Sequence, residues 1–271
     1  MRLWLGLLGA AAWLTPAAGW ACDAVQLEYV EEALAGDRLL QAERMLAQLR
    51  PTCEAEPGYR RLVGRWALGT ARHDEAFAAF SVLATALPDD SEALSGAGRA
   101  AFNLGRYDEA MDLLVRASLL PGADWRTWNA LAVLHDRQRA WPASAEAYRQ
   151  AFALASDEAA VWNNRGYSLL LQQRFAEAAS DLDRAVALDS NNEIFRTNRD
   201  LAHAMAGRFG ARRTGESDRQ WAGRLNNMGY AAFLAGNRAA ARSLLARAIE
   251  ESDVAMARAE ANLALAEGTG N

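Results

Sequence analysis

Lysine is absent from the 271-residue sequence, so all 29 basic residues are arginine. This excludes chemistry that needs a lysine amine, such as Schiff-base catalysis or a P-loop. Histidine is rare, with 3 residues, and no pair has the spacing of metal ligands on a helix. The 34 acidic residues give a net charge of −5, which disfavours nucleic-acid binding because that requires a basic surface. There is also no glycine-rich phosphate loop and no Gly-x-Ser-x-Gly motif, so the sequence indicates no enzyme, no cofactor and no metal.

The first 21 residues have the pattern of an export signal. Arg2 precedes an apolar run over residues 3–14, and Pro16 and small residues at 17–19 follow. The run is too short to span a bilayer comfortably, and no other stretch is long and apolar enough. We therefore expect residues 1–21 to be a signal peptide and the mature chain to be periplasmic, with no transmembrane span.

The remainder repeats with a period of 34 residues. The block His73-Asp74-Glu75-Ala76 recurs as residues 107–110 and 175–178, and Trp128 and Trp162 are also 34 residues apart. Units starting at residues 23, 57, 91, 125, 159 and 193 need no insertion or deletion. A period of this length is typical of stacked helix-turn-helix units.

Equivalent positions of the units have equivalent chemistry, so each unit is predicted to be two packed helices. Small residues let two helix backbones approach closely, and bulky apolar residues fill the space beside them. We expect an aspartate to cap the second helix of several units. The small column is Gly64, Gly98, Ala132 and Gly166, the bulky column is Leu46, Phe80, Leu114, Tyr148 and Leu182, and the expected caps are Asp37, Asp74 and Asp108.

This pattern resembles the tetratricopeptide repeat family. The residues that carry the resemblance are Trp128, Trp162, Gly98, Gly166, Tyr107, Ala110, Phe175 and Ala178. The resemblance implies an all-α fold, a right-handed superhelical solenoid of helix-turn-helix repeats. It also implies that the first helices of the pairs line a concave groove that binds protein segments.

The register breaks once, near residue 207. Asp200 and Arg212 stand in the small columns of the last in-phase unit, and the phase resumes at 222, five residues early. We expect an array over residues 22–206, a broken repeat or linker over 207–221, and a C-terminal repeat with a capping helix (about 254–266) over 222–271. The break is rich in arginine, which favours a solvated hinge or, alternatively, a patch for an acidic partner or lipid head groups.

Cys22 and Cys53 are the only cysteines. In an exported protein they are expected to form a disulfide, because the first helix starts after Cys22 and its antiparallel partner ends before Cys53. The alternative is a lipid anchor at Cys22, which would make the protein a membrane-anchored lipoprotein. Trp20 argues against the anchor, because small residues normally precede a lipidated cysteine.

Asparagine recurs early in the first helices, beside two tyrosines. An asparagine amide both donates and accepts hydrogen bonds, so it suits recognition of a peptide backbone. The opposing interpretation is that these amides bond neighbouring helices. The candidate groove residues are Asn129, Asn163, Asn164, Tyr167, Asn198, Asn226, Asn227 and Tyr230.

The sequence thus favours an exported scaffold that binds protein segments of the bacterial envelope. It is similar to the tetratricopeptide proteins of tight-adherence (Flp-type) pilus machinery, which implies a role in assembling a pilus or secretion system. The alternatives are a periplasmic coordinator of outer-membrane or cell-wall synthesis and an enzyme with a site in the arginine-rich break.

Overall fold

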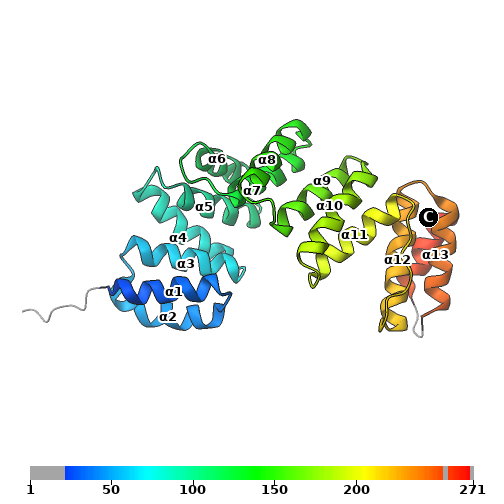
Figure 1. The fold of residues 1–271 in the computed structure, drawn as a ribbon, viewed down its shortest axis with the longest axis horizontal. Coiled ribbons are helices and arrows are strands. Elements are labelled where there is room, and N and C mark those ends of the chain that lie inside the picture. The colour runs from blue at the N-terminus through cyan, green and yellow to red at the C-terminus, as the bar shows by residue number, and fades with distance from the viewer. Residues whose placement is uncertain (1–21, 253–255, 269–271) are drawn as a thin grey trace, which may run out of the picture. The chain divides into compact units, whose positions relative to one another are not determined.

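The computed structural model describes residues 22–252 and 256–268 (Figure 1). Within them the chain forms fourteen α-helices and no strand, which confirms the all-α prediction. The predicted signal peptide, residues 1–21, lies outside the described residues. The first seven helices are α1 (Ala24–Ala35), α2 (Leu39–Cys53), α3 (Pro57–Gly69), α4 (His73–Ala86), α5 (Ser91–Asn103), α6 (Tyr107–Ser118) and α7 (Trp125–Arg137). The other seven are α8 (Trp141–Leu154), α9 (Ala159–Leu171), α10 (Phe175–Leu188), α11 (Glu193–Met205), α12 (Asp218–Leu234), α13 (Arg238–Glu250) and α14 (Ala257–Glu267).

The helix starts keep the 34-residue period. The first helices of the pairs, α3, α5, α7, α9 and α11, begin at residues 57, 91, 125, 159 and 193. The second helices, α2, α4, α6, α8 and α10, begin at residues 39, 73, 107, 141 and 175. The phase predicted from the sequence is therefore confirmed.

The turn inside each pair also repeats. One residue per turn has a positive φ, and the next N–H closes the turn on a carbonyl five residues back, as Arg72 does to Ala67 at 2.8 Å. This bond and the left-handed residue define the Schellman ending of a helix. The left-handed residues inside the pairs are Asp37, Ala71, Gly105, Arg139, Gln173 and Gly236, and Gly207 ends α11 in the same way.

The prediction that aspartates cap the second helices is wrong. The cap positions of α2, α4 and α6 are arginines without a capping side-chain bond. Asp37 instead occupies the left-handed position of its turn, whereas Asp74 and Asp108 lie inside the first turn of α4 and α6. The reason is that the Schellman turn leads directly into the second helix. In the first turn the carboxylates of Asp74 and Asp108 face the positive end of the helix dipole.

The small and bulky columns pack against each other. A Cβ atom placed on Gly166 of α9 would lie 2.6 Å from Cγ of Leu182 on α10, closer than any real contact allows. Both residues are buried, so the close approach of the helices depends on the missing side chain. The same contact joins Gly64 to Phe80, Gly98 to Leu114 and Gly229 to Leu245.

The described helices divide into two compact units, with the boundary between residues 122 and 123. The first unit, with α1–α6, has a core around Val30, Leu46 and Trp66. The second unit, with α7–α14, has a core around Trp221, Leu225 and Leu245 at its C-terminal end.

The break in register appears as a missing helix. After α11 ends at Met205, no helix forms until α12 begins at Asp218, so α11 has no second helix of its own. We call residues 206–217 the strap. Ser217 caps α12 through a capping box with Gln220, so that helix begins four residues before the resumed phase at 222. The predicted terminal helix is present as α14, and residues 253–255 before it lie outside the described residues.

Candidate partner-binding surface

Four of the predicted asparagines form one hydrogen-bonded ladder across the first helices of the second unit. Nδ2 of Asn198 on α11 donates to Oδ1 of Asn163 on α9 at 2.9 Å. Asn163 donates to the neighbouring Asn164 at 3.2 Å, and Asn164 donates to Asn129 on α7 at 3.1 Å. The amides therefore run from α11 to α7 with all donors pointing the same way.

A second, shorter ladder follows the same plan. Nδ2 of Asn262 on α14 donates to Asn226 on α12 at 2.9 Å, and Asn226 donates to Asn227 at 3.3 Å. Asn262 was not among the predicted residues. The sequence does contain a signal for Asn262. It follows Asn198 by 64 residues, which is nearly the spacing of 63 residues between Asn163 and Asn226.

The ladders correct part of the predicted groove. Asn163 and Asn226 are buried, and both ends of each amide are engaged by other asparagines, so they belong to helix packing and not to a binding surface. Asn227 is exposed, as are the rings of Tyr167 (47 %) and Tyr230 (39 %). The interpretation that the amides bond neighbouring helices thus applies to Asn163 and Asn226, and the groove stays a prediction for the exposed residues.

The ends of the ladders keep unused hydrogen-bonding capacity. Among the described residues, Nδ2 of Asn129 and Nδ2 of Asn227 have no acceptor, and Oδ1 of Asn198 has no donor. A peptide backbone offers the complementary carbonyl and N–H groups. These ends and the two exposed tyrosines are the part of the predicted groove that can contact a partner.

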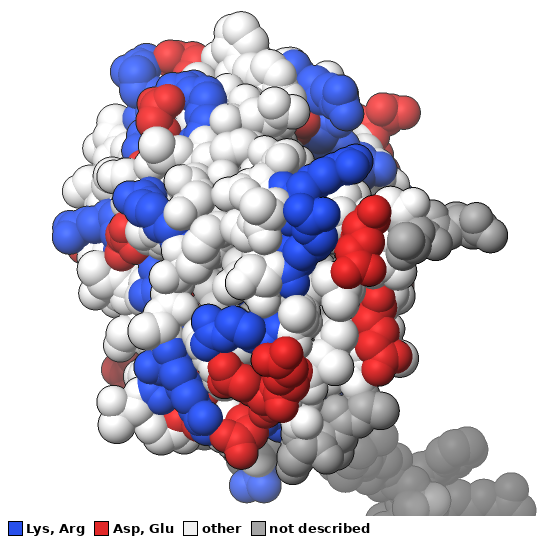
Figure 2. Space-filling view, turned by 90° about the vertical axis from the view of Figure 1, so that its right-hand side faces the viewer, with Lys and Arg blue, Asp and Glu red and all other residues white. Residues whose placement is uncertain are grey.

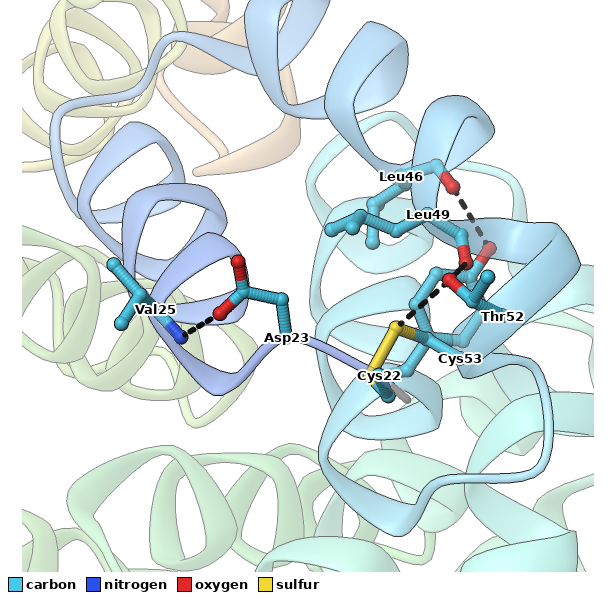
Figure 3. Close-up of a disulfide and its surroundings, with 8 residues drawn as sticks. Cys22, Asp23, Val25, Leu46, Leu49, Thr52 and Cys53 are labelled. Carbon is cyan, nitrogen blue, oxygen red and sulfur yellow. Dashed lines mark hydrogen bonds between the residues drawn. A yellow bond between two sulfur atoms is a disulfide. The ribbon is translucent and has the colours of Figure 1, made fainter. Parts of the chain in front are cut away.

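The two cysteines are joined in the first unit. Cys22 and Cys53 form a disulfide with their Cα atoms 4.8 Å apart, and it ties the residues before α1 to the last residue of α2 (Figure 3). Cys53 is fully buried, and Tyr59 closes the same region by donating to the carbonyl of Leu46 at 3.0 Å. In this arrangement neither thiol is free.

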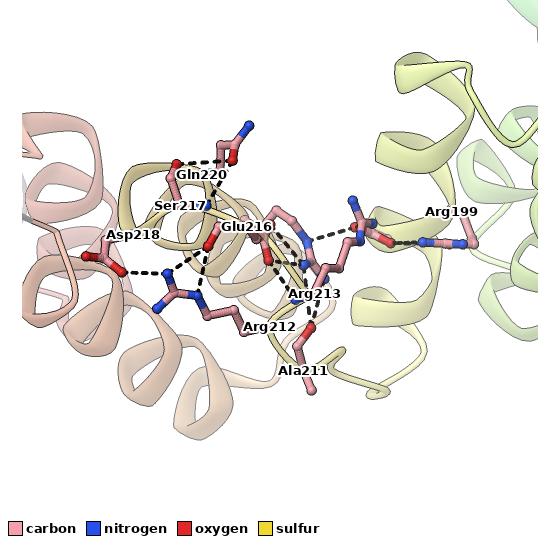
Figure 4. Close-up of polar contacts among 10 residues, drawn as sticks. Arg199, Ala211, Arg212, Arg213, Glu216, Ser217, Asp218 and Gln220 are labelled. Atoms are coloured by element: carbon pink, nitrogen blue, oxygen red, sulfur yellow. Dashed lines mark hydrogen bonds and ion pairs between the residues drawn. The ribbon is translucent and has the colours of Figure 1, made fainter.

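Arg212 and Arg213 of the break and Arg224 just after it pair with carboxylates (Figure 4), although most of residues 207–217 are exposed to solvent. Asp200 on α11 accepts from Arg213 at 2.5 Å and from Arg224 at 3.1 Å. Arg224 also donates to Glu216 at 2.8 Å, and Arg212 donates to Asp218 at 2.6 Å. The strap is held on α11 and α12 because each of these charges has a partner there.

Glu216 is the most buried acid of this network, with 7 % of its side chain exposed. Burial raises the pKa of its carboxyl, but the N–H of Arg213 and the guanidinium of Arg224 outweigh burial, and the pKa is lowered. Glu216 is therefore a carboxylate at neutral pH.

Sequence reasoning missed a buried polar cluster around Asp136 of α7. Its carboxylate accepts from Ser144 at 2.5 Å, from Tyr148 at 2.9 Å and from Ser168 at 2.6 Å, joining α7, α8 and α9. Burial, followed by the charge and hydrogen bond of Asp136, raises the pKa of Tyr148 well above its ordinary value. The signal was Tyr148 itself, the only bulky-column residue with a hydroxyl group.

The surface gives no sign of a metal site or a membrane span. Within residues 22–252 and 256–268, no group of three or more His, Cys, Asp or Glu side chains could hold a metal ion. Over the same ranges, every helix is too short or too polar to cross a membrane. On the face drawn in Figure 2, basic and acidic side chains are interspersed and neither sign forms a continuous field.

Tetratricopeptide repeat models match residues 67–134 and 129–193 of the chain. No curated protein matches it. Among the solved structures that resemble it, three have a TM-score of 0.57. One is the APC/C hetero-tetramer Cut9–Hcn1, at 16 % identity over 90 % of this chain and 42 % of that chain, so this chain spans less than half of its length.

The second similar structure is a thermophilic tetratricopeptide protein from Thermus thermophilus, at 15 % identity over 66 % of this chain and 97 % of that one. The third is PilW, a widely conserved type IV pilus biogenesis factor, at 12 % identity over 87 % of this chain and 96 % of that one. At these identities the likeness is one of fold.

Proposed function

Because this chain belongs to the tetratricopeptide repeat family, we propose that it is an exported, non-catalytic scaffold that holds segments of other envelope proteins during assembly of a pilus or secretion apparatus. Its partners are protein or peptide segments. It needs no cofactor, because its task is to position partners and not to transform a substrate.

The observation that carries the proposal is the line of unused amide groups and exposed tyrosines on the second unit. Asn129 and Asn227 offer donors, Asn198 offers an acceptor, and Tyr167 and Tyr230 offer apolar rings with a polar tip. An extended protein segment presents carbonyl and N–H groups along its length, which such ends can bind without reading a particular sequence.

The envelope location is supported by the export pattern of residues 1–21 and by the Cys22–Cys53 disulfide, because disulfides persist in oxidising compartments. The pilus assignment is supported by the shared fold of PilW over 87 % of this chain. Pilus or secretion subunits as partners fit both the envelope location and the fold that is shared with PilW.

The test is capture from an envelope extract with the tagged full chain, quantified by mass spectrometry. Asn164→Ala is a poor test variant, because Asn164 is a middle member of a ladder and its loss strands the amides on either side of it. The better variant combines Tyr167→Ala and Tyr230→Ala, since both side chains are exposed and neither belongs to a ladder.

The matched control is Tyr29→Ala, which removes the same kind of exposed side chain from the first unit. We expect the test variant to lose its pilus or secretion partners while its melting temperature stays near that of the control. Equal capture by the two variants would contradict the proposal.

A further inference from the structure

The first helix of a pair receives the second helix of the pair before it, and α5 shows where. Ala93 and Ala97 of α5 pack on Phe80 and Leu83 of α4. A Cβ placed on Gly96 would lie 2.5 Å from the ring of Phe80. Residues three or four apart share one face of a helix, and 93, 96, 97 and 100 are all buried. We call these four positions the receiving face of a first helix.

The receiving face of α3 is buried in the same way. Its residues stand 34 positions earlier, and Tyr59, Leu62 and Trp66 among them are at most 6 % exposed. Leu46 and Leu49 of α2 belong to the same core, and the hydroxyl of Tyr59 donates to the carbonyl of Leu46 at 3.0 Å. In both pairs, therefore, the preceding second helix covers the face.

The receiving face of α1 has no described helix to cover it. It consists of Val25, Glu28, Tyr29 and Glu32, another 34 positions earlier. All four residues are exposed, Val25 by 52 % and Tyr29 by 54 %. The opposite side of the helix, with Val30, is fully buried in the core of the first unit. Thus α1 presents outward the face that its counterparts use for helix packing.

Two carboxylates distinguish this face from those of α3 and α5. The helix α1 contains three glutamates and no basic residue. Glu31 pairs with Arg65 at 2.7 Å, whereas Glu28 and Glu32 form no ion pair with another described residue. Arg38 donates to the carbonyl oxygen of Glu32 at 3.0 Å and not to its carboxylate. The face therefore combines apolar contact with unpaired negative charge.

These charges decide which kind of helix can dock. An apolar helix would bury Glu28 and Glu32 without partners, which is strongly unfavourable because a buried charge needs an opposite one. A helix with basic side chains along an apolar stripe supplies both kinds of contact. The complementary occupant is therefore basic and amphipathic.

We propose that the receiving face of α1 binds a basic amphipathic helix of a partner protein, docked as the second helix of a preceding pair would be. Its apolar side chains pack on Val25 and Tyr29, and its basic side chains pair with Glu28 and Glu32. The face belongs to the first unit, so this proposal does not depend on the proposed groove of the second unit.

The helix α13 of this chain supplies a suitable probe, because it is a second helix with the required pattern. Its residues Arg238, Arg242, Leu245 and Ile249 share one face. A fluorescent peptide of residues 238–250 is titrated with the full chain, and binding is followed by fluorescence anisotropy. The matched control is a peptide of α10, residues 175–188, which is also a second helix but carries three acids and one arginine.

Charge reversal locates the binding. The test variant combines Glu28→Arg and Glu32→Arg. Its matched control combines Glu56→Arg and Asp89→Arg, at two exposed acids that lie outside the face and form no ion pair with another described residue. Circular dichroism checks that each variant is folded, and sedimentation velocity measures whether the chain associates with itself.

We expect saturable binding of the α13 peptide, which the test variant weakens at least about tenfold and the control variant changes little. The α10 peptide should bind the test variant better than it binds the wild type. Tyr29→Ala should also weaken binding of the α13 peptide. Tyr167→Ala with Tyr230→Ala should leave it unchanged, which separates this face from the proposed groove.

The proposal is overturned if the α13 peptide does not bind saturably, or if the wild type binds the α10 peptide equally well. Equal loss of binding in the test and control variants would also overturn it. Self-association of the wild type that Glu28→Arg with Glu32→Arg abolishes would assign the face to a second copy of this chain instead of a basic partner.

Discussion

Asp200 and Glu216 are held together by Arg224, which donates to Asp200 at 3.1 Å and to Glu216 at 2.8 Å. The two acids stand 34 residues after Gly166 and Leu182, whose contact packs α9 against α10. At the break, therefore, a salt bridge replaces the apolar contact of an ordinary repeat. The strap takes the place of the missing helix, and ion pairs rather than apolar packing hold it to α11 and α12.

This exchange makes the strap sensitive to acid. Because the pKa of Glu216 is lowered in the folded chain, its contribution is complete above the ordinary glutamate value of about 4.3 and is lost as pH falls through the folded value. We expect Glu216→Gln to cost about 1–3 kcal/mol at neutral pH, since Arg224 and the N–H of Arg213 lose a charged acceptor.

Urea denaturation of wild type and Glu216→Gln across pH measures this difference. It should shrink as pH falls through the lowered pKa of Glu216, where the wild-type carboxyl also becomes protonated. Glu250→Gln, at an exposed position of α13, is the control and should have little effect at any pH. An equal difference at acidic and neutral pH would show that the charge of Glu216 is not what holds the strap.

The left-handed residues of the turns predict opposite effects of similar substitutions. Gly105 has a φ of 77° and no heavy atom within 4 Å of a built Cβ, so Gly105→Ala should cost about 1 kcal/mol through backbone strain alone. Gln173, with a φ of 60°, carries that strain already. Gln173→Gly should therefore stabilise the chain, by less than that amount because glycine also loosens the unfolded state.

Gly223 is the control for these turn variants, because it lies inside α12 and also has open space around a built Cβ. There, Gly223→Ala should stabilise by about 0.5–1 kcal/mol, since alanine is the better helix former. Thermal melts of the three variants measure these signs. If Gly105→Ala and Gly223→Ala shift the melting temperature in the same direction, the left-handed turn is not the cause.

The Asp136 cluster predicts that Tyr148 does not ionise in the pH range of an ordinary tyrosine. Tyr148→Phe should cost about 1.5–3 kcal/mol, because it removes a buried hydrogen bond to a charged acceptor and keeps the ring. Since the pKa of Tyr148 is raised well above its ordinary value, ultraviolet titration of the folded variant should show no loss of phenolate signal. Tyr167→Phe, at an exposed ring outside the cluster, is the control and should change the free energy of unfolding little.

The disulfide predicts that the chain shows no free thiol until it is reduced. A closed loop between Cys22 and Cys53 should stabilise the terminal helix pair by about 3–4 kcal/mol in the chain-entropy description. Thiol titration and intact mass of protein from the periplasm, with the Cys22→Ser, Cys53→Ser double variant for comparison, measure this. An acyl chain on Cys22 with a reactive Cys53 would instead establish the lipoprotein alternative.

The 34-residue spacing was enough to predict the helix pairs, because the same contact between a small and a bulky residue recurs in each of them. Gly166 and Leu182 could be paired from the sequence for that reason. The capping positions could not, since the column of Asp74 and Asp108 is shifted from the cap by the Schellman turn. Local turn geometry, and not the repeat, decides those positions.

The asparagine columns were visible in the sequence, but their use was not. A column specifies that Asn163 and Asn198 lie on neighbouring helices; it does not specify whether their amides face each other or a partner. The same limit applies at the break, where Asp200 and Arg212 were clearly out of pattern. Only the path of the strap shows that Asp200 is neutralised by Arg213 and Arg224.

The Asp200–Arg224–Glu216 bridge also fixes the order of the modules. Pairs joined by a glycine and a leucine are interchangeable in principle, so duplication or deletion of a whole 34-residue unit leaves an acceptable joint. The pair begun by α11 accepts only a neighbour that brings an arginine at the position of Arg224. The helices α12–α14 are therefore matched to α11, and replacing them by an ordinary 34-residue unit would leave Asp200 and Glu216 without their shared arginine.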